Sequence, residues 1–309
     1  MKARQIKKQN SLINSIKEAS PYYLMLLPGL ILLIIYKYLP IYGVTIAFKN
    51  YNIMKGILGS PWVGLEHFEK LFGMSKFYQV FYNTLIISFQ KIVFQFPFPI
   101  IFAILLNELK NQRFKKVVQT VTYIPHFISW VIISGIFIDI LSPSTGIVNY
   151  IIQALGGKPV RFMTDPDIFR GVLVVSSIWK DFGYDAIIYL AAITTISQEQ
   201  YEAAIVDGAN RFQRIWHVTL PGISSTIIVM LILRLGKIMD VGHEQILMMY
   251  NNAVYDKADV LSTYIYRVGL GNMQYSLTAA AGLFQSVIGC IMLFLSNLFA
   301  KKMGESGIV

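Results

Sequence analysis

Long apolar stretches alternate with short polar segments along this chain of 309 residues. Six of the apolar stretches are long enough to cross a bilayer core of about 30 Å as helices of about 20 residues each. We expect these helices near residues 22–48, 78–107, 118–141, 171–196, 222–250 and 277–300. The pattern therefore predicts an all-α, polytopic membrane protein with six transmembrane helices.

The composition agrees with a membrane protein. The chain is 55% hydrophobic and 14% charged, with a mean hydropathy of +0.54, whereas soluble domains carry about a quarter charged residues. The net charge of +10 would suit nucleic acid, but Lys and Arg gather at the ends of the apolar stretches. This placement is typical of membrane topology, so we expect no nucleic-acid partner.

The distribution of Lys and Arg predicts the orientation. If the N-terminus is cytoplasmic, the inner segments carry thirteen Lys and Arg and the longer outer loops carry nine. The excess favours a multi-pass membrane protein with both termini in the cytoplasm. The predicted order is a cytoplasmic tail at 1–21, a transmembrane domain at 22–300 that includes an inner loop at 197–221, and a cytoplasmic tail at 301–309.

Residues that carry chemistry on a substrate are missing from the sequence. Cys290 is the single cysteine, and the four histidines lack the spacing of a metal site. Neither a phosphate-binding G-x-x-x-x-G-K-[ST] nor a dinucleotide-binding G-x-G-x-x-G is present. We therefore expect no catalytic residue, metal or cofactor in this chain, and any energy source must come from a partner.

We expect two short helices in the polar segment between the fourth and fifth apolar stretches, "SQEQYEAAIVDGANRFQRIWHVTLP". Ser197 and Gln200 fit a capping box at the start of the first helix. Gly208 suits the left-handed position that ends it. A second helix is expected from Asn210, and Pro221 closes the loop. An amphipathic helix lying on the lipid surface is the alternative interpretation.

The spacing within this segment resembles the EAA loop of permease subunits in type I binding-protein-dependent ABC importers. Val218 stands where that family usually has Ile, which is a conservative departure. "SPYYLMLLPGLILLIIYKYLPIYG", "NTLIISFQKIVFQFPFPIIFAILLNEL", "YIPHFISWVI" and "IWKDFGYDAIIYLAAI" extend the likeness, particularly to permeases for oligosaccharides. The residues that carry the EAA pattern are Glu202, Ala203, Ala204, Gly208, Val218, Leu220 and Pro221.

The resemblance implies a location in the bacterial cytoplasmic membrane. It also implies a coupling loop that docks on a cytoplasmic ATPase and moves with it during alternating access. The implied partners are a second permease, in a heterodimer, two ATP-binding subunits that hold ATP and Mg, an extracytoplasmic solute-binding protein, a carbohydrate and membrane lipid.

An importer of peptides or of another solute is the nearest alternative function. An ion-coupled secondary transporter is a further one. It would show inverted repeats and Gly/Pro-broken helices in both halves, and we find no convincing repeat. A non-transporting scaffold would leave the intramembrane charges unexplained.

Polar side chains inside the apolar stretches are candidates for the substrate pathway, because charges in a membrane are costly. Aromatic rings suit sugars because their faces stack on C–H groups. An internal lattice of ion pairs is the alternative, and the acidic neighbours favour Tyr184 over Trp179. The candidates are Trp179, Asp181, Tyr184, Asp185 and Tyr189 in the fourth stretch, and Lys237, Asp240 and Glu244, in a helical stripe with Arg234, in the fifth. Weaker candidates are Asn83, Gln90, Gln95 and Gln285.

Overall fold

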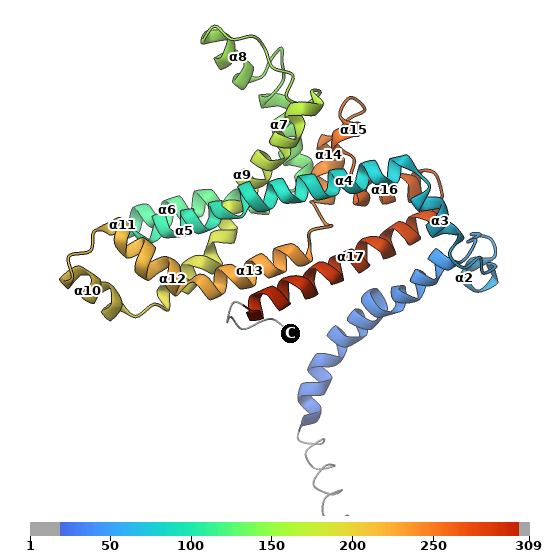
Figure 1. Ribbon diagram of the computed structural model, residues 1–309, viewed down its shortest axis with the longest axis horizontal. Coiled ribbons are helices and arrows are strands. Elements are labelled where there is room, and N and C mark those ends of the chain that lie inside the picture. The colour runs from blue at the N-terminus through green and yellow to red at the C-terminus, as the bar shows by residue number, and fades with distance from the viewer. Residues whose placement is uncertain (1–18, 303–309) are drawn as a thin grey trace, which may run out of the picture.

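The computed structural model describes residues 19–302, which fold as helices joined by turns and loops (Figure 1). Within this part of the chain, extended pairing is limited to one isolated bridge between Lys49 and Trp62. The all-α prediction is therefore confirmed for the described residues. Most of the two predicted tails, residues 1–18 and 303–309, lies outside them.

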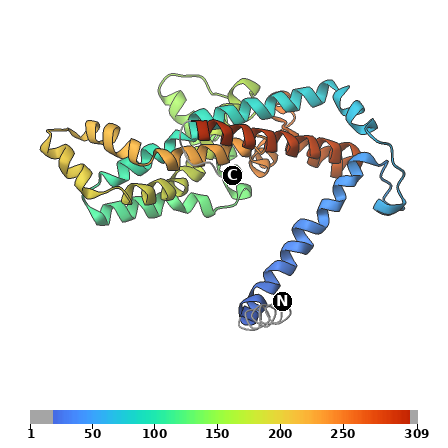
Figure 2. The ribbon, with the colours of Figure 1, turned by 60° about the horizontal axis from the view of Figure 1, so that its bottom comes forward.

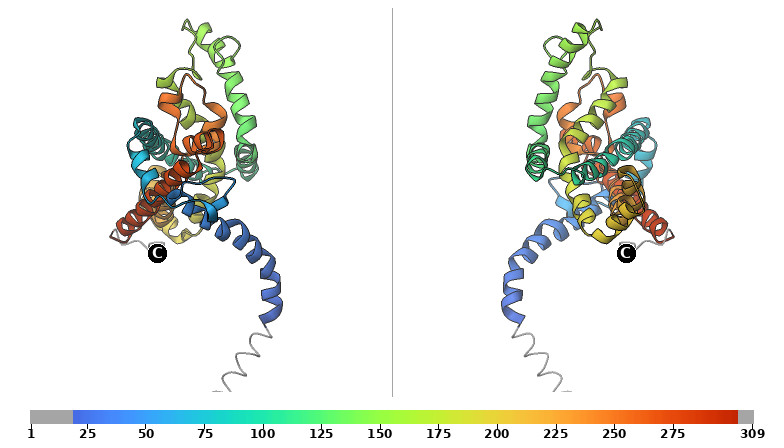
Figure 3. Two further views of the ribbon diagram at one scale, coloured as in Figure 1. Left: turned by 90° about the vertical axis from the view of Figure 1, so that its right-hand side faces the viewer. Right: turned by 90° about the vertical axis from the view of Figure 1, so that its left-hand side faces the viewer.

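The first apolar stretch is a helix over Ala19–Phe48 that passes through a π turn, η1 (Ile34–Tyr38), and ends in a 3₁₀ turn, η2 (Leu39–Phe48). None of the residues in its most apolar window is buried. Figure 2 and the left panel of Figure 3 show it leaving the helical body at an angle. Such a surface needs lipid or another chain to cover it.

The second stretch follows two short helices, α2 (Gly56–Gly59) and α3 (Glu66–Phe72). It runs as one helix of 33 residues, Ser75–Asn107. A π turn interrupts it just before Pro97, because proline lacks the N–H that a regular helix needs. The pieces of this helix are α4 (Ser75–Gln90), η3 (Lys91–Gln95) and α5 (Pro97–Asn107).

The third stretch is broken, and the prediction of one continuous helix at 118–141 is wrong. The helix α6 (Gln112–Tyr123), with the turn η4 (Ile124–Phe127), meets α7 (Trp130–Ile140) at a bend of 103°. Pro125 restricts the backbone here, and Ile128 is extended, which ends the helical hydrogen bonding. A short helix, α8 (Ile147–Ala154), follows beyond α7.

The fourth stretch is the helix α9 (Pro166–Thr194), 29 residues long, with Asp165 as its N-cap. The predicted loop after it contains α10 (Gln198–Val206), α11 (Arg211–Arg214), a π turn η5 (Ile215–Thr219) and α12 (Leu220–Gly222). In Figure 1, α10 and α11 lie together at one end of the bundle, far from α15 and α8.

The fifth stretch is also broken, so the continuous helix predicted at 222–250 is wrong. The helix α13 (Ser224–Gly236) ends in a non-helical segment, residues 237–242, and α14 (His243–Met249) resumes after it. The remaining elements are α15 (Tyr255–Ala258), α16 (Leu261–Tyr266), η6 (Arg267–Gly271) and α17 (Tyr275–Lys302).

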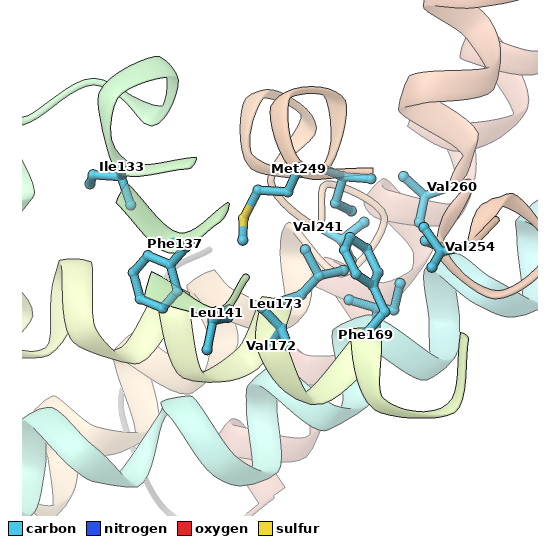
Figure 4. Packing of buried hydrophobic residues seen from close by; sticks show 13 residues of the cluster. Ile133, Phe137, Leu141, Phe169, Val172, Leu173, Val241, Met249, Val254 and Val260 are labelled. Carbon is cyan, nitrogen blue, oxygen red and sulfur yellow. The ribbon is translucent and has the colours of Figure 1, made fainter. Parts of the chain in front are cut away.

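A central apolar cluster holds the broken stretches against α9. Figure 4 shows Phe137 of α7, Leu173 of α9 and Met249 of α14 converging on this cluster. By length and composition, three helices of the described chain could cross a membrane, or five if each bent pair counts as one span. The two bent pairs are α6–α7 and α11–α13, the second with a bend of 60°.

Candidate functional site

The break in the fifth stretch, residues 237–242, is stabilised by side chains from the second and sixth stretches. Three backbone carbonyls that the break leaves without helical partners each accept a side-chain hydrogen bond. Ser88 donates to the carbonyl of Ile238, and Gln285 Nε2 donates to that of Met239 at 2.8 Å. Lys91 Nζ donates to that of Val241, also at 2.8 Å. Non-helical backbone is tolerated at membrane depth only where it is buried in protein or lines a water-filled cavity, and these side-chain bonds satisfy it there.

Lys91 belongs to a buried polar network that the sequence analysis missed. Its ammonium donates to Gln245 Oε1 at 2.5 Å, and that oxygen also accepts from the Ser177 hydroxyl at 2.9 Å. The Gln245 amide in turn donates to the Leu173 carbonyl and the Ser176 hydroxyl. A lysine inside "SFQKIVF" was the signal that could have revealed this network, because ionisable residues inside apolar stretches are functional candidates.

A cavity of about 220 Å³, called here the central cavity, lies between the break and α9. A second cavity of about 240 Å³, the side cavity, shares Gln95, Arg234 and Lys237 with it. Both are small relative to sites that enclose a whole ligand. The polar lining of the central cavity is Ser88, Lys91, Gln95, Ser177, Asp181, Arg234, Lys237, Asp240 and Gln245.

The predicted polar stripe of the fifth stretch is wrong as a helical face. Arg234 lies on α13, whereas Lys237 and Asp240 lie in the break and Glu244 lies on α14. The structure nevertheless brings Arg234, Lys237 and Asp240 together in the wall of the central cavity, and Glu244 is not part of it. The stripe assumed a regular helix, which the break at 237–242 removes.

The candidates on α9 separate into different surroundings. Asp181 lines the central cavity and lies 3.0 Å from Nδ1 of His126, a residue that the sequence analysis passed over. Tyr184 stacks flat on the same His126 ring, with centroids 3.8 Å apart, and lines neither cavity. Asp185 and the buried Tyr189 line the side cavity instead.

Trp179 and the weaker candidates mostly have structural partners. Trp179 packs against Phe137, with centroids 5.8 Å apart, and lines neither cavity. The Asn83 amide donates to the carbonyls of Asp256 and Asp259. Gln95 accepts a hydrogen bond of 2.5 Å from Arg234. Gln90 Oε1 is buried without a hydrogen-bond partner among the described residues.

The loop at 197–221 has the two-helix form expected from the sequence. Ser197 caps α10, but its hydroxyl accepts from the Glu199 N–H at 3.2 Å, so the predicted capping box with Gln200 is wrong. A capping box does begin α11, between Asn210 and Gln213. The missed signal was an Asn three residues before a Gln, which is the same pattern one helix later.

Gly208 lies in the left-handed region, with φ +81°, as predicted. Its N–H donates to the Ile205 carbonyl, and the Ala209 N–H donates to the Ala204 carbonyl. These two hydrogen bonds make a Schellman motif that ends α10 and turns the chain toward α11. Phe212 is 84% exposed on α11, so the loop presents apolar surface away from the bundle.

Residues 95–305 match the family of binding-protein-dependent transport system inner membrane components. This match covers more than half of the chain, including the break at 237–242, the lining of the side cavity and the loop with Gly208. It also covers the lining of the central cavity except Ser88, Lys91 and Ile92. The chain belongs to this family. It is therefore a transporter subunit, as the EAA pattern predicted, and its membrane localisation agrees with its apolar helices.

Two relatives from Bacillus subtilis (strain 168) resemble this permease along nearly its whole length. Protein LplB is 45% identical over 286 residues, which are 93% of this chain and 90% of LplB. The polygalacturonan/rhamnogalacturonan transport system permease protein YteP is 41% identical over 301 residues, which are 97% of this chain and 94% of YteP.

Solved structures give the same result for the fold. A chain of a bacterial ABC transporter involved in the import of the acidic polysaccharide alginate is 42% identical, with a TM-score of 0.87, over 94% of this chain and 99% of that one. A chain from a bacterial alginate ABC transporter in complex with an alginate pentasaccharide-bound periplasmic protein is 41% identical, with a TM-score of 0.88. The permease fold predicted from the sequence thus agrees with that of ABC transporter subunits.

Proposed function

We propose that this chain forms one half of the translocation pathway of an ATP-driven importer of oligosaccharides. The observation that carries the proposal is the likeness along nearly the whole chain to subunits whose names specify polysaccharide transport. A second permease would supply the opposing wall of the pathway, since the central cavity and the side cavity are small. An extracytoplasmic solute-binding protein would deliver the sugar, and two ATP-binding subunits would supply the energy.

The loop at 197–221 is proposed to couple the permease to the ATPase. Three observations support this role: the loop lies at one end of the bundle (Figure 1), its two helices have fixed caps, and Phe212 and Trp216 are exposed. The residues proposed to meet the ATPase include the exposed Glu202, Ala203, Gly208 and Pro221 and the half-buried Ala204, Val218 and Leu220.

We propose that the chain crosses the membrane six times, with both termini in the cytoplasm. Three continuous helices and the two bent pairs supply five of these spans, and α9 supplies the sixth, because 29 residues of α-helix reach about 44 Å at 1.5 Å per residue. Asp181 and Asp185 of α9 line the two cavities, and Lys180 donates to backbone carbonyls. Charged residues are tolerated inside a membrane when they face such surroundings rather than lipid.

Cysteine labelling in intact cells tests this topology. In a Cys290→Ser background, a cysteine at Arg211 should react only after the membrane is opened, because α11 would lie in the cytoplasm. A cysteine at Lys257 should react from outside with an impermeant reagent. Labelling of position 211 in intact cells would overturn the proposed orientation.

Transport in cells tests the proposed function. Deleting the gene for this chain should abolish growth on, and uptake of, one class of oligosaccharide, and the intact chain should restore both. The restored uptake should require a co-purifying ATPase. Uptake of peptides instead would support the nearest alternative, and uptake driven by an ion gradient without ATP would support a secondary transporter.

A further inference from the structure

Lys91 is a cation held inside the bundle with only 7% of its surface exposed. An ammonium group has three N–H donors. Two of them are used, toward the Val241 carbonyl and Gln245 Oε1, and both of these acceptors are uncharged. Lys91 also lines the central cavity. One donor of a buried charge is therefore left for whatever enters that cavity.

The helix break does not require a charge at position 91. Ser88 and Gln285 satisfy the neighbouring carbonyls of Ile238 and Met239 with neutral groups. A neutral donor at position 91 could satisfy the Val241 carbonyl in the same way. A buried ammonium group that has neither an opposite charge nor an acceptor for its third donor is strongly destabilising, so its presence here calls for a role beyond the backbone bond.

Lys180 on α9 shows what a purely structural lysine looks like in this protein. It is also only 7% exposed. Its ammonium donates to three carbonyls, those of Pro125, His126 and Ile128. All of its donors are occupied, and it is absent from the lining of both cavities.

Two more cations line the central cavity without a carboxylate partner. Arg234 has a side-chain hydrogen bond to the amide oxygen of Gln95. Among the described residues, no carboxylate lies within 4.0 Å of Lys91, Arg234 or Lys237. The cavity has two carboxylates, Asp181 and Asp240, against these three cations. Asp181 is already paired with His126.

We propose that Lys91 and Arg234 form a binding site for the carboxylate of an acidic sugar unit as it passes through the central cavity. A carboxylate would accept the free donor of Lys91 and the remaining guanidinium donors of Arg234, in charge-assisted hydrogen bonds. The volume of about 220 Å³ suits one unit of a longer chain rather than a whole oligosaccharide. The site rests on the proposed function and narrows its substrate class to uronate oligosaccharides.

Uptake by cells that contain the complete importer tests the site. The probes are the trisaccharides of galacturonate and of mannuronate, each beside its carboxyl-reduced form, which keeps the linkages and loses the charge. Lys91→Met and Arg234→Gln should each lower uptake of the acidic form about tenfold or more at equal protein abundance, the loss expected for one charge-assisted bond. Lys91→Arg, which keeps the charge, should retain most of the wild-type uptake of the acidic form. If Lys91→Met lowers the abundance of the permease, Arg234→Gln still tests the same site.

Lys180→Met is the matched control, because it removes a lysine of equal burial that has no free donor. We expect it to lower abundance while leaving uptake of the acidic form per molecule unchanged. The proposed carboxylate site is wrong if Lys91→Met and Arg234→Gln both take up the acidic form at the wild-type rate. If the wild type carries the neutral trisaccharides but neither acidic one, the carboxylate inference is wrong and the carbohydrate function stands. If it carries none of the four and transports peptides, the proposed function itself is wrong.

Discussion

Replacing Gly208 with valine is expected to lower uptake at least tenfold while the permease still inserts in the membrane at normal abundance. The backbone at Gly208 has φ +81°, which a β-branched residue adopts only at a cost of about 1–3 kcal/mol. Valine would therefore disrupt the Schellman motif that ends α10 and change the angle at which α11 follows. An ATPase that docks on both helices would then bind less well, so less of it should co-purify.

Two controls separate docking from a general folding defect. A Cβ at Gly208 would meet no other part of the described chain within 4 Å, so the β-carbon of valine has room there. Gly56 has the same two properties, with φ +65° and open space around it, at the end of the bundle away from α10. Gly56→Val should leave ATPase binding intact, and Gly208→Asn should be milder because asparagine tolerates the left-handed region. Normal uptake by Gly208→Val with a full complement of ATPase would contradict the coupling assignment.

The features that the sequence predicted well are those that depend on neighbouring residues. Gly208 ends its helix because only nearby backbone groups decide that conformation, and Ser197 caps α10 for the same reason. The apolar stretches are long enough to mark the helices, and α9 and α17 run close to their expected bounds. The family could be recognised because its motif lies in one continuous loop.

The features that the sequence did not predict depend on residues far apart in the chain. Residues 237–242 leave the helical conformation where side chains of Ser88, Lys91 and Gln285 bind their carbonyls, and no local pattern shows those bonds. Extending a helix through the break produced the incorrect stripe. His126 was missed for the same reason, because it meets Asp181 only after the third stretch bends.

Gly183→Ala is expected to reduce the abundance and the melting temperature of the permease, although it adds a single methyl group. A Cβ on Gly183 would press on the Thr122 carbonyl, at 2.7 Å from its carbon, so α9 and α6 could not keep their present separation. Small residues allow this kind of close helix contact in membrane proteins. Overpacking of a rigid contact costs about 1–3 kcal/mol. The cost should be at the upper end, because Lys180 binds three carbonyls of the chain just after Thr122 and would be displaced with them.

Gly171→Ala is the matched control, because Gly171 lies on the same helix and a Cβ there would meet nothing within 4 Å. Alanine favours the helical conformation over glycine by about 1 kcal/mol, so Gly171→Ala should melt at or slightly above the wild-type temperature. Thermal unfolding of the purified importer complex, followed by the loss of soluble permease, measures both variants side by side. The pair isolates the contact with Thr122 from the general effect of adding a methyl group to α9. Equal melting temperatures for Gly183→Ala and the wild type would show that α6 can move away from α9 without cost, and that the Lys180 bonds do not hold it there.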